Sequence, residues 1–261
     1  MSIVFIPVII IYMSESAKTI TCIIPAYNEG QTIAGVVEVC LKTPQINEVI
    51  VVNDGSQDDT LAKLKPLAKK IKIISLAKSR GKGYAVAQGI KAALNPYLLF
   101  LDADLLNLES RHLYSLSRPV IEGWADMTVA GLISAQNPLR RTYWRFCGQR
   151  CFQKDSLVPL IKEIEKTNYG LEVFLNEKFR EKKMIIVPLV FRSEYHFVKQ
   201  KKQKDWLMAY AREVWQVFQQ TVSVKTSPRK KVKSEFLHGL ADYLKISYQR
   251  LKKIIFEDLE G

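Results

Sequence analysis

The N-terminal half of the chain alternates short apolar runs with amphipathic stretches, and this alternation restricts the fold more than any other feature. Apolar runs typical of buried strands lie at residues 19–25, 47–54, 72–76 and 97–104. Helical patterns lie between them at residues 32–41, 60–70 and 83–94. Continuous apolar strands separated by helices of this length indicate βαβ units. The sequence therefore predicts an α/β fold whose mostly parallel sheet is covered by helices on both faces.

Unusual polar clusters follow three of these predicted strands. The segments are AYNEG after the first strand, DGSQDD after the second and DAD after the fourth. Parallel strands end at one edge of their sheet, and ligands of such sheets bind beyond that edge. We therefore expect the three clusters to form one binding site.

The second half is mixed and ends in a basic tail. We expect helices at residues 113–121, 157–166 and 169–183, and strands at 127–133 and 184–191. Residues 199–261 carry 14 Lys and Arg against 7 Asp and Glu, and they contain two amphipathic helical patterns. The net charge of +13 favours anionic partners. We expect an N-terminal extension (1–18), a main domain (19–198) and a basic helical tail (199–261).

The N-terminal extension contains a ten-residue apolar run at residues 3–12, IVFIPVIIIY. This is about half of the ~20 residues that a transmembrane helix requires. Three interpretations stay open: translation from Met13, an added edge strand, or a tail that touches a membrane. Four cysteines without a CxxC pair favour reduced thiols in a cytoplasmic protein.

Asp102 and Asp104 place two carboxylates directly after an apolar strand. Such a pair becomes favourable when a hard divalent cation neutralises it, and substrate phosphates usually complete the coordination. The alternative is an ordinary charged loop.

The first two clusters supply hydrogen-bond acceptors. Asn28, Glu29 and Asp54 suit ribose hydroxyls and base N–H groups, although the same residue types also form turns and helix caps. Lys82, flanked by glycines at the start of a helix, suits a phosphate. Neither a Walker A loop nor GxGxxG after the first strand occurs, which argues against a dinucleotide dehydrogenase.

Taken together, IIPAYNEG, VVNDGSQDDT, SRGKGYA and FLDADL resemble, in this order and spacing, the family 2-type glycosyltransferases of the GT-A fold. The resemblance covers residues 19–191. It implies a Rossmann-like sheet flanked by helices, here with a C-terminal helical basic extension. It also implies that Lys82 approaches the base or phosphates of a nucleotide sugar, and that Asp102 and Asp104 hold Mg²⁺ or Mn²⁺ against the diphosphate. The residues it implies for the nucleoside pocket are Pro25, Tyr27, Glu29 and Asp54.

The segments GQRCF and KTNYGLEVFLNEKF resemble the acceptor half of polyprenyl-phosphate hexose synthases and glucosyl-3-phosphoglycerate synthases. The resemblance implies that Glu172 faces the acceptor hydroxyl, as general base in an inverting reaction or as positioning residue in a retaining one. It implies that His196 is a third metal ligand and that Arg150, Tyr169 and Gly170 bind the acceptor. The alternatives are that Glu172 is a solvent-facing carboxylate of a helix, that His196 is an ordinary surface histidine and that Arg150 is simple surface charge.

These observations predict a metal-dependent glycosyltransferase that moves a hexose from a UDP- or GDP-sugar to a phosphorylated small molecule or a lipid phosphate. A sugar-phosphate nucleotidyltransferase and a non-catalytic membrane- or protein-binding module are the alternatives. The basic tail could rest on an anionic membrane, and the protein would then be peripheral to the inner face of that membrane. Alternatively, the helices of the tail pack on the main domain or at a dimer interface. No recognised nucleic-acid-binding module accompanies the charge.

Overall fold

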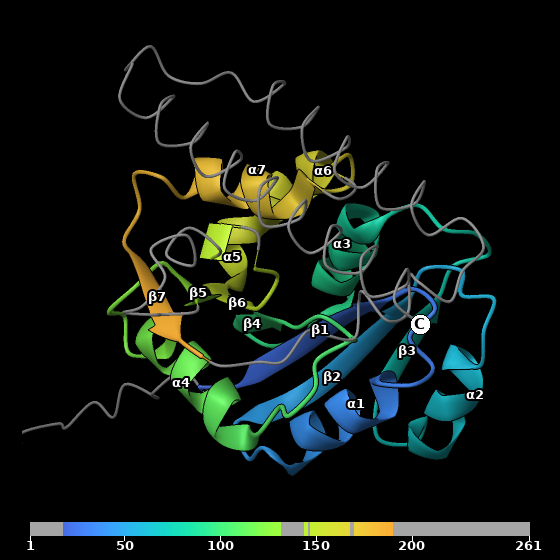
Figure 1. The fold of residues 1–261 in the computed structure, drawn as a ribbon. Coiled ribbons are helices and arrows are strands. Elements are labelled where there is room, and N and C mark those ends of the chain that lie inside the picture. Colours follow the sequence, from blue (N-terminus) through green and yellow to red (C-terminus); the bar gives the residue numbers. More distant parts are fainter. Residues whose placement is uncertain (1–17, 132–143, 146, 168–169, 190–261) are drawn as a thin grey trace, which may run out of the picture.

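The computed structural model describes residues 18–131, 144–145, 147–167 and 170–189, and these form an α/β unit around one seven-stranded sheet. The strand order is β3-β2-β1-β4-β6-β5-β7 (Figure 1). The strands are β1 (Ile20–Ala26), β2 (Ile46–Asn53), β3 (Lys72–Ser75), β4 (Tyr97–Phe100), β5 (Met127–Gly131), β6 (Arg150–Gln153) and β7 (Met184–Pro188).

Six of the strands run in one direction. β1 pairs in parallel with β2 and β4, β2 with β3, and β5 with β7. Only β6 runs the other way, between β4 and β5. The predicted mostly parallel sheet is thus confirmed, and the reversed strand β6 is an addition that the apolar pattern did not reveal.

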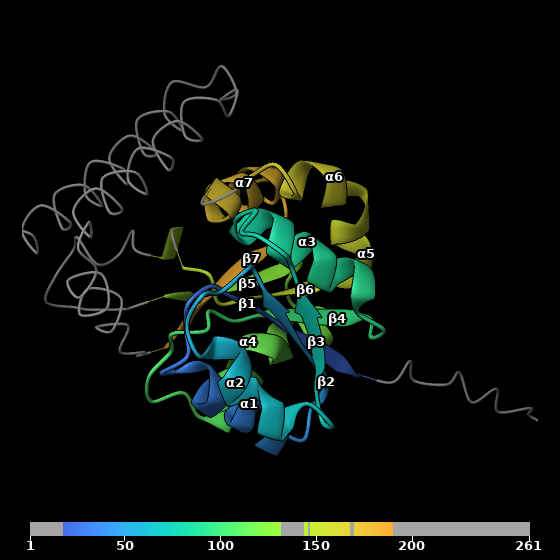
Figure 2. The same cartoon turned by 90° about the vertical axis from the view of Figure 1, so that its right-hand side faces the viewer.

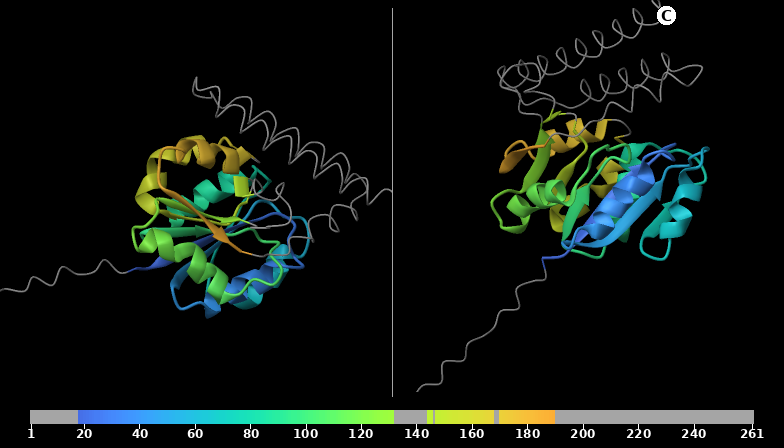
Figure 3. Two further views of the ribbon diagram at one scale, coloured as in Figure 1. Left: turned by 60° about the vertical axis from the view of Figure 1, so that its left-hand side comes forward. Right: turned by 60° about the horizontal axis from the view of Figure 1, so that its bottom comes forward.

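Helices cover both faces of the sheet, as Figure 2 shows: α1, α2 and α4 lie on one face, and α3, α5, α6 and α7 on the other. Figure 3 shows β7 at the edge of the sheet that is farther from β3. The helices are α1 (Ile33–Lys42), α2 (Thr60–Leu64), α3 (Lys82–Ala92), α4 (Ser110–Ile121), α5 (Lys154–Leu157), α6 (Ile161–Ile164) and α7 (Leu171–Lys178).

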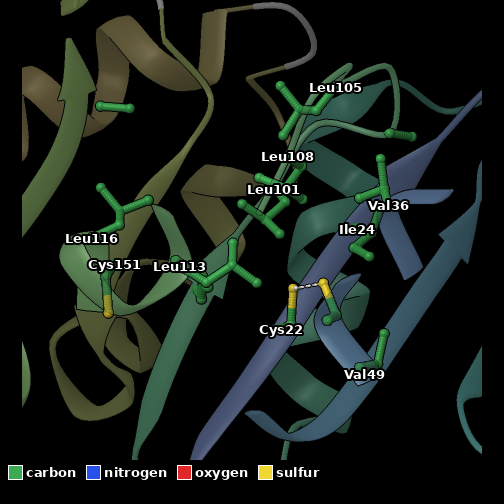
Figure 4. Packing of buried hydrophobic residues seen from close by; sticks show 14 of the residues in the cluster. Cys22, Ile24, Val36, Val49, Leu101, Leu105, Leu108, Leu113, Leu116 and Cys151 are labelled. Atoms are coloured by element: carbon green, nitrogen blue, oxygen red, sulfur yellow. Dashed lines mark hydrogen bonds between the residues drawn. The ribbon is translucent and has the colours of Figure 1, made fainter. Parts of the chain in front are cut away.

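The buried strand β1 divides its side chains between two hydrophobic clusters. Cys22 and Ile24 pack in the cluster that includes α1 and α4 (Figure 4), whereas Ile23 packs in the cluster that includes α3 and α7. This alternation follows from the two-residue period of a strand. Cys22 lies 3.6 Å from Cys40, sulfur to sulfur, and none of the four cysteines forms a disulfide in the structure.

Two predicted helices are interrupted by a 3₁₀ turn. The helix expected at residues 60–70 ends after Leu64 and continues as a 3₁₀ turn, Lys65–Leu67, which contains Pro66. The helix expected at 157–166 is split into α5 and α6 by a 3₁₀ turn that contains Pro159. Proline lacks the N–H that a helix interior requires, and this accounts for both interruptions.

The N-terminal extension and the basic tail lie outside the described residues. Among the helices that the structure describes, none is long and apolar enough to cross a membrane.

Candidate active site

The polar clusters of the sequence meet at the carboxyl edge of the parallel strands. β1 ends at Ala26, β2 at Asn53 and β4 at Phe100, and the register places these ends side by side. The segments that follow them are residues 27–30, 54–58 and 101–104. This confirms the prediction that the three clusters share one edge.

The loops after β1 and β2 are joined by hydrogen bonds. The backbone N–H of Asn28, which has a φ of 55°, donates to Ser56 Oγ at 2.9 Å. The N–H of Gln57 donates to Asn28 Oδ1 at 2.8 Å, and the N–H of Glu29 donates to Thr60 Oγ1 at 2.8 Å. Asn28 therefore forms a turn, which was the alternative to binding a ribose or base in the prediction from the sequence.

Asp54 holds the loop that leads into α3. Its carboxylate accepts hydrogen bonds from Ser79 Oγ at 2.7 Å, from the N–H of Arg80 at 2.7 Å and from the N–H of Gly81 at 2.9 Å. The next residue, Gly55, has a φ of 72°, and a Cβ there would lie 2.6 Å from the backbone of the same loop. Asp54 is 4% exposed, so its visible role is to fix residues 79–81 and the start of α3.

Lys82, the first residue of α3, lies between two carboxylates. Its Nζ is 2.6 Å from Asp102 Oδ1 and 2.6 Å from Glu172 Oε1. Burial alone would lower the pKa of Lys82, but the negative charges of Asp102 and Glu172 outweigh burial and raise this pKa above its ordinary value. The ammonium is therefore a fixed cation in a site that two carboxylates line.

The second oxygen of Asp102 is bound by a residue from the other half of the chain. Gln149 Nε2 donates to Asp102 Oδ2 at 2.7 Å, and Gln149 Oε1 accepts from Cys147 Sγ at 2.6 Å. Burial raises the pKa of Cys147 to about 12, so its thiol keeps its proton at neutral pH. Gly148, between Cys147 and Gln149 in the chain, allows the backbone to lie close to Asp102 and Lys82. A Cβ at this position would lie 2.4 Å from Asp102 Oδ1 and 2.7 Å from Lys82 Nζ.

Arg150 was expected to bind the acceptor, but the structure buries it to 1% exposure. Its Nε donates to the Cys147 carbonyl at 2.8 Å, and its Nη1 donates to Asn176 Oδ1 at 2.7 Å. Asn176 Nδ2 in turn donates to the Arg145 carbonyl at 2.7 Å. In this position Arg150 supports the loop before β6 and connects it to α7.

The remaining predicted site residues differ in their exposure to solvent. Asp104 is 8% exposed and Glu29 is 9% exposed, whereas Tyr27 is 42% exposed. Pro25 lies in β1, and Gly170 precedes α7 with its N–H donating to the Thr167 carbonyl at 2.7 Å.

Two predicted residues, Tyr169 and His196, lie outside the described residues. Among the residues that are described, no three His, Cys, Asp or Glu side chains are grouped as metal ligands. In the structure the ammonium of Lys82 is the cation that bridges Asp102 and Glu172.

Gln149 and Gly148 were not among the site residues predicted from the sequence. Neither residue type at this position suggests a site, since the contact with Asp102 spans 47 positions of sequence. The only indication in the chain was that GQRCF fell within the resembling segment.

The fold is an α/β architecture with polar residues at the carboxyl edge of its parallel strands, and comparison with known proteins identifies the family. The sequence model of "Glycosyl transferase family 2" matches residues 21–223, so the chain belongs to that family. The resemblance read from the motifs is thereby confirmed.

Curated relatives match this chain over short segments. Dolichyl-phosphate beta-glucosyltransferase of Drosophila melanogaster is 40% identical over 99 residues, which are 33% of this chain and 30% of that protein. Poly-beta-1,6-N-acetyl-D-glucosamine synthase of Staphylococcus aureus (strain COL) is 36% identical over 99 residues, 35% of this chain and 23% of that protein. The match thus spans about a third or less of each relative's length.

Solved structures share the fold. Glucosyl-3-phosphoglycerate synthase from Mycobacterium tuberculosis, in complex with phosphoglyceric acid, superposes with a TM-score of 0.54 and 22% identity, over 68% of this chain and 73% of that chain. The same enzyme in complex with Mn²⁺ and UDP-glucose gives 0.53 and 22%, over 67% and 71%. These similarities confirm the GT-A fold.

Proposed function

We propose that this protein is a divalent-metal-dependent hexosyltransferase that uses a UDP- or GDP-sugar and a phosphorylated acceptor. The observation that carries the proposal is the cation site at the carboxyl edge of the sheet, where Lys82 lies 2.6 Å from each of Asp102 and Glu172. Membership of glycosyl transferase family 2 supports the reaction class.

The donor's nucleoside would lie at the ends of β1 and β2. Tyr27 is exposed enough to stack on a base, and Pro25 and Glu29 flank it in the chain. Asp54 would contribute by holding the loop 79–81, from which Lys82 reaches the diphosphate.

Asp102 and Asp104 would hold Mg²⁺ or Mn²⁺, with His196 as the proposed third ligand. When bound, the metal supplies positive charge that stabilises the leaving diphosphate. Asp102 suits this role because its carboxylate already accepts one cation in the structure. The solved relative with Mn²⁺ and UDP-glucose supports both the metal and a UDP-sugar.

Glu172 would act on the acceptor side of the centre. In an inverting reaction the anomeric carbon forms a bond to the acceptor oxygen, the bond to the diphosphate breaks, and Glu172 takes the proton of the acceptor group. In a retaining reaction Glu172 would position the acceptor. Tyr169 and Gly170, which immediately precede α7, would bind the same acceptor.

The acceptor class is a phosphorylated small molecule or a polyprenyl phosphate. Support comes from the phosphoglyceric acid in one solved relative and from the dolichyl phosphate in the name of a curated relative. For a lipid acceptor, the basic tail would bring the site to the inner face of an anionic membrane, with the protein otherwise cytoplasmic.

The test is a turnover assay with and without Mn²⁺. The donors are the UDP and GDP derivatives of glucose and mannose, and the acceptors are 3-phosphoglycerate and polyprenyl phosphate. Release of UDP or GDP with formation of a glycosylated acceptor is expected. Asp102→Asn should abolish turnover, whereas Asp155→Asn, an exposed aspartate of α5, should not. Pyrophosphate release would instead reveal a nucleotidyltransferase, and no binding of any nucleotide sugar would favour a binding module.

A further inference from the structure

We propose that Gln149 is a positioning residue that orients the Asp102 carboxylate toward the metal. This inference rests on the proposed function, because it concerns how the chain presents Asp102 to a divalent cation. It assigns a role to a side chain that none of the sequence motifs singled out.

The first observation is that the two oxygens of Asp102 have different partners. Oδ2 accepts the amide N–H of Gln149 at 2.7 Å, and Oδ1 accepts the ammonium of Lys82 at 2.6 Å. The neutral donor therefore fixes one oxygen and leaves the other facing the cation. Rotation of the carboxylate would break the bond to Gln149.

The second observation is that the Gln149 amide itself is oriented. Cys147 Sγ donates to Gln149 Oε1 at 2.6 Å, so the amide oxygen is turned to the thiol and the NH₂ group to Asp102. Gln149 is 4% exposed, so water has little access with which to replace these bonds. The thiol thus selects which end of the amide Asp102 meets.

The third observation is that contacts of both chain neighbours of Gln149 restrict the loop that carries it. Gly148 passes so close to Asp102 that a Cβ there would lie 2.4 Å from Oδ1. On the other side, Arg150 ties the loop to α7 through its bonds to the Cys147 carbonyl and Asn176. The position of Gln149 is therefore fixed from both neighbours.

Residues that hydrogen-bond a metal-binding carboxylate fix its orientation, and their loss typically weakens metal binding about 10- to 100-fold. Gln149→Met keeps the length of the side chain and removes both hydrogen bonds. We therefore expect the Kd of Gln149→Met for Mn²⁺ to rise about 10- to 100-fold relative to the wild-type protein.

The experiment is a titration of the full chain with Mn²⁺ alone, in which the EPR signal of free Mn²⁺ gives the Kd, followed by the Kd for UDP without metal. The matched control is Gln88→Met on α3. It removes the hydrogen bond that the Gln88 amide donates to the carboxylate of Glu165. We expect the control to keep wild-type affinity for Mn²⁺, and we expect both variants to keep wild-type affinity for metal-free UDP.

A second pair of variants tests the orienting thiol without changing Gln149. Cys147→Ser retains a hydroxyl donor for Oε1 and should bind Mn²⁺ as the wild-type protein does. Cys147→Val removes the donor and should bind Mn²⁺ more weakly.

The inference is overturned if folded Gln149→Met and Cys147→Val both bind Mn²⁺ within about twofold of a wild-type protein that binds it, since a purely structural glutamine would lower only the melting temperature. A wild-type protein that binds no Mn²⁺ or Mg²⁺ would instead overturn the proposed function, and this inference with it. The wild-type titration therefore distinguishes the two failures.

Discussion

Replacing Lys82 by methionine should tighten the binding of Mn²⁺ alone and weaken the binding of UDP. The ammonium of Lys82 donates a hydrogen bond to Asp102 Oδ1 at 2.6 Å, and a metal would need the same oxygen. A metal that binds Asp102 in the wild-type protein must therefore first separate this ion pair. Methionine has a similar length and carries no charge, so it removes the competitor while Gln149 still holds the other oxygen.

The size of the effect follows from the contact that is lost. A hydrogen bond to a charged group contributes about 1.5–3 kcal/mol, equivalent to about 10- to 150-fold in a dissociation constant. The side chains of Lys82 and Asp102 are 24% and 28% exposed, so solvent weakens their attraction. We therefore expect the lower end, a Kd for Mn²⁺ that falls about tenfold. The Kd for metal-free UDP should rise, because the diphosphate loses a cation.

The assay is again Mn²⁺ titration by EPR, with metal-free UDP binding measured by calorimetry. Lys91→Met is the matched control, because Lys91 lies on the same helix and pairs with Glu165 instead of Asp102. The control should change neither Kd. The reasoning is refuted if Lys82→Met folds and binds Mn²⁺ as weakly as the wild-type protein or more weakly.

Two further predictions concern stability, each measured by urea denaturation. Arg150→Lys keeps the charge but cannot replace the bonds to the Cys147 carbonyl and Asn176, so the free energy of unfolding should fall by about 1–3 kcal/mol; an unchanged stability with weaker acceptor binding would restore the acceptor role. Burial raises the pKa of Cys151 from 9.0 to about 12. Above pH 9 the unfolded chain therefore loses a proton that the folded chain keeps, and stability should fall by up to about 1.4 kcal/mol per pH unit. Cys151→Val should flatten this decline between pH 9 and 11; parallel curves would contradict the assignment.

Most of the fold could be predicted because its information is local. The apolar runs and the helical patterns between them gave β1 to β4, α1 and α3 to within a few residues. The polar clusters at the strand ends located the site, because parallel strands share their carboxyl edge. Where the local pattern misled, a proline inside it, Pro66 or Pro159, interrupted the helix.

The partners within the site could not be predicted, because they depend on contacts between distant parts of the chain. The ion pair between Lys82 and Glu172 spans 90 positions, and the bond from Gln149 to Asp102 spans 47. The burial of Arg150 could not be predicted for a related reason. An arginine is usually exposed. Only the tertiary structure shows that Arg150 is buried and that the Cys147 carbonyl and the Asn176 amide oxygen accept its hydrogen bonds.

Under the proposed function, the ion pairs of Lys82 with Asp102 and Glu172 would also connect donor binding to metal binding. Asp54 holds the loop before α3, so the end of β2 and the position of Lys82 are joined through the hydrogen bonds to residues 80 and 81. A diphosphate bound at the start of α3 would attract Lys82, and every step of Lys82 toward the phosphates withdraws it from Asp102 and Glu172. Under the proposed function, the same movement would free Asp102 for the metal and Glu172 for the acceptor. One lysine would then make the binding of the donor, the metal and the acceptor interdependent, and the opposite changes expected in Lys82→Met for Mn²⁺ and UDP follow from this proposal.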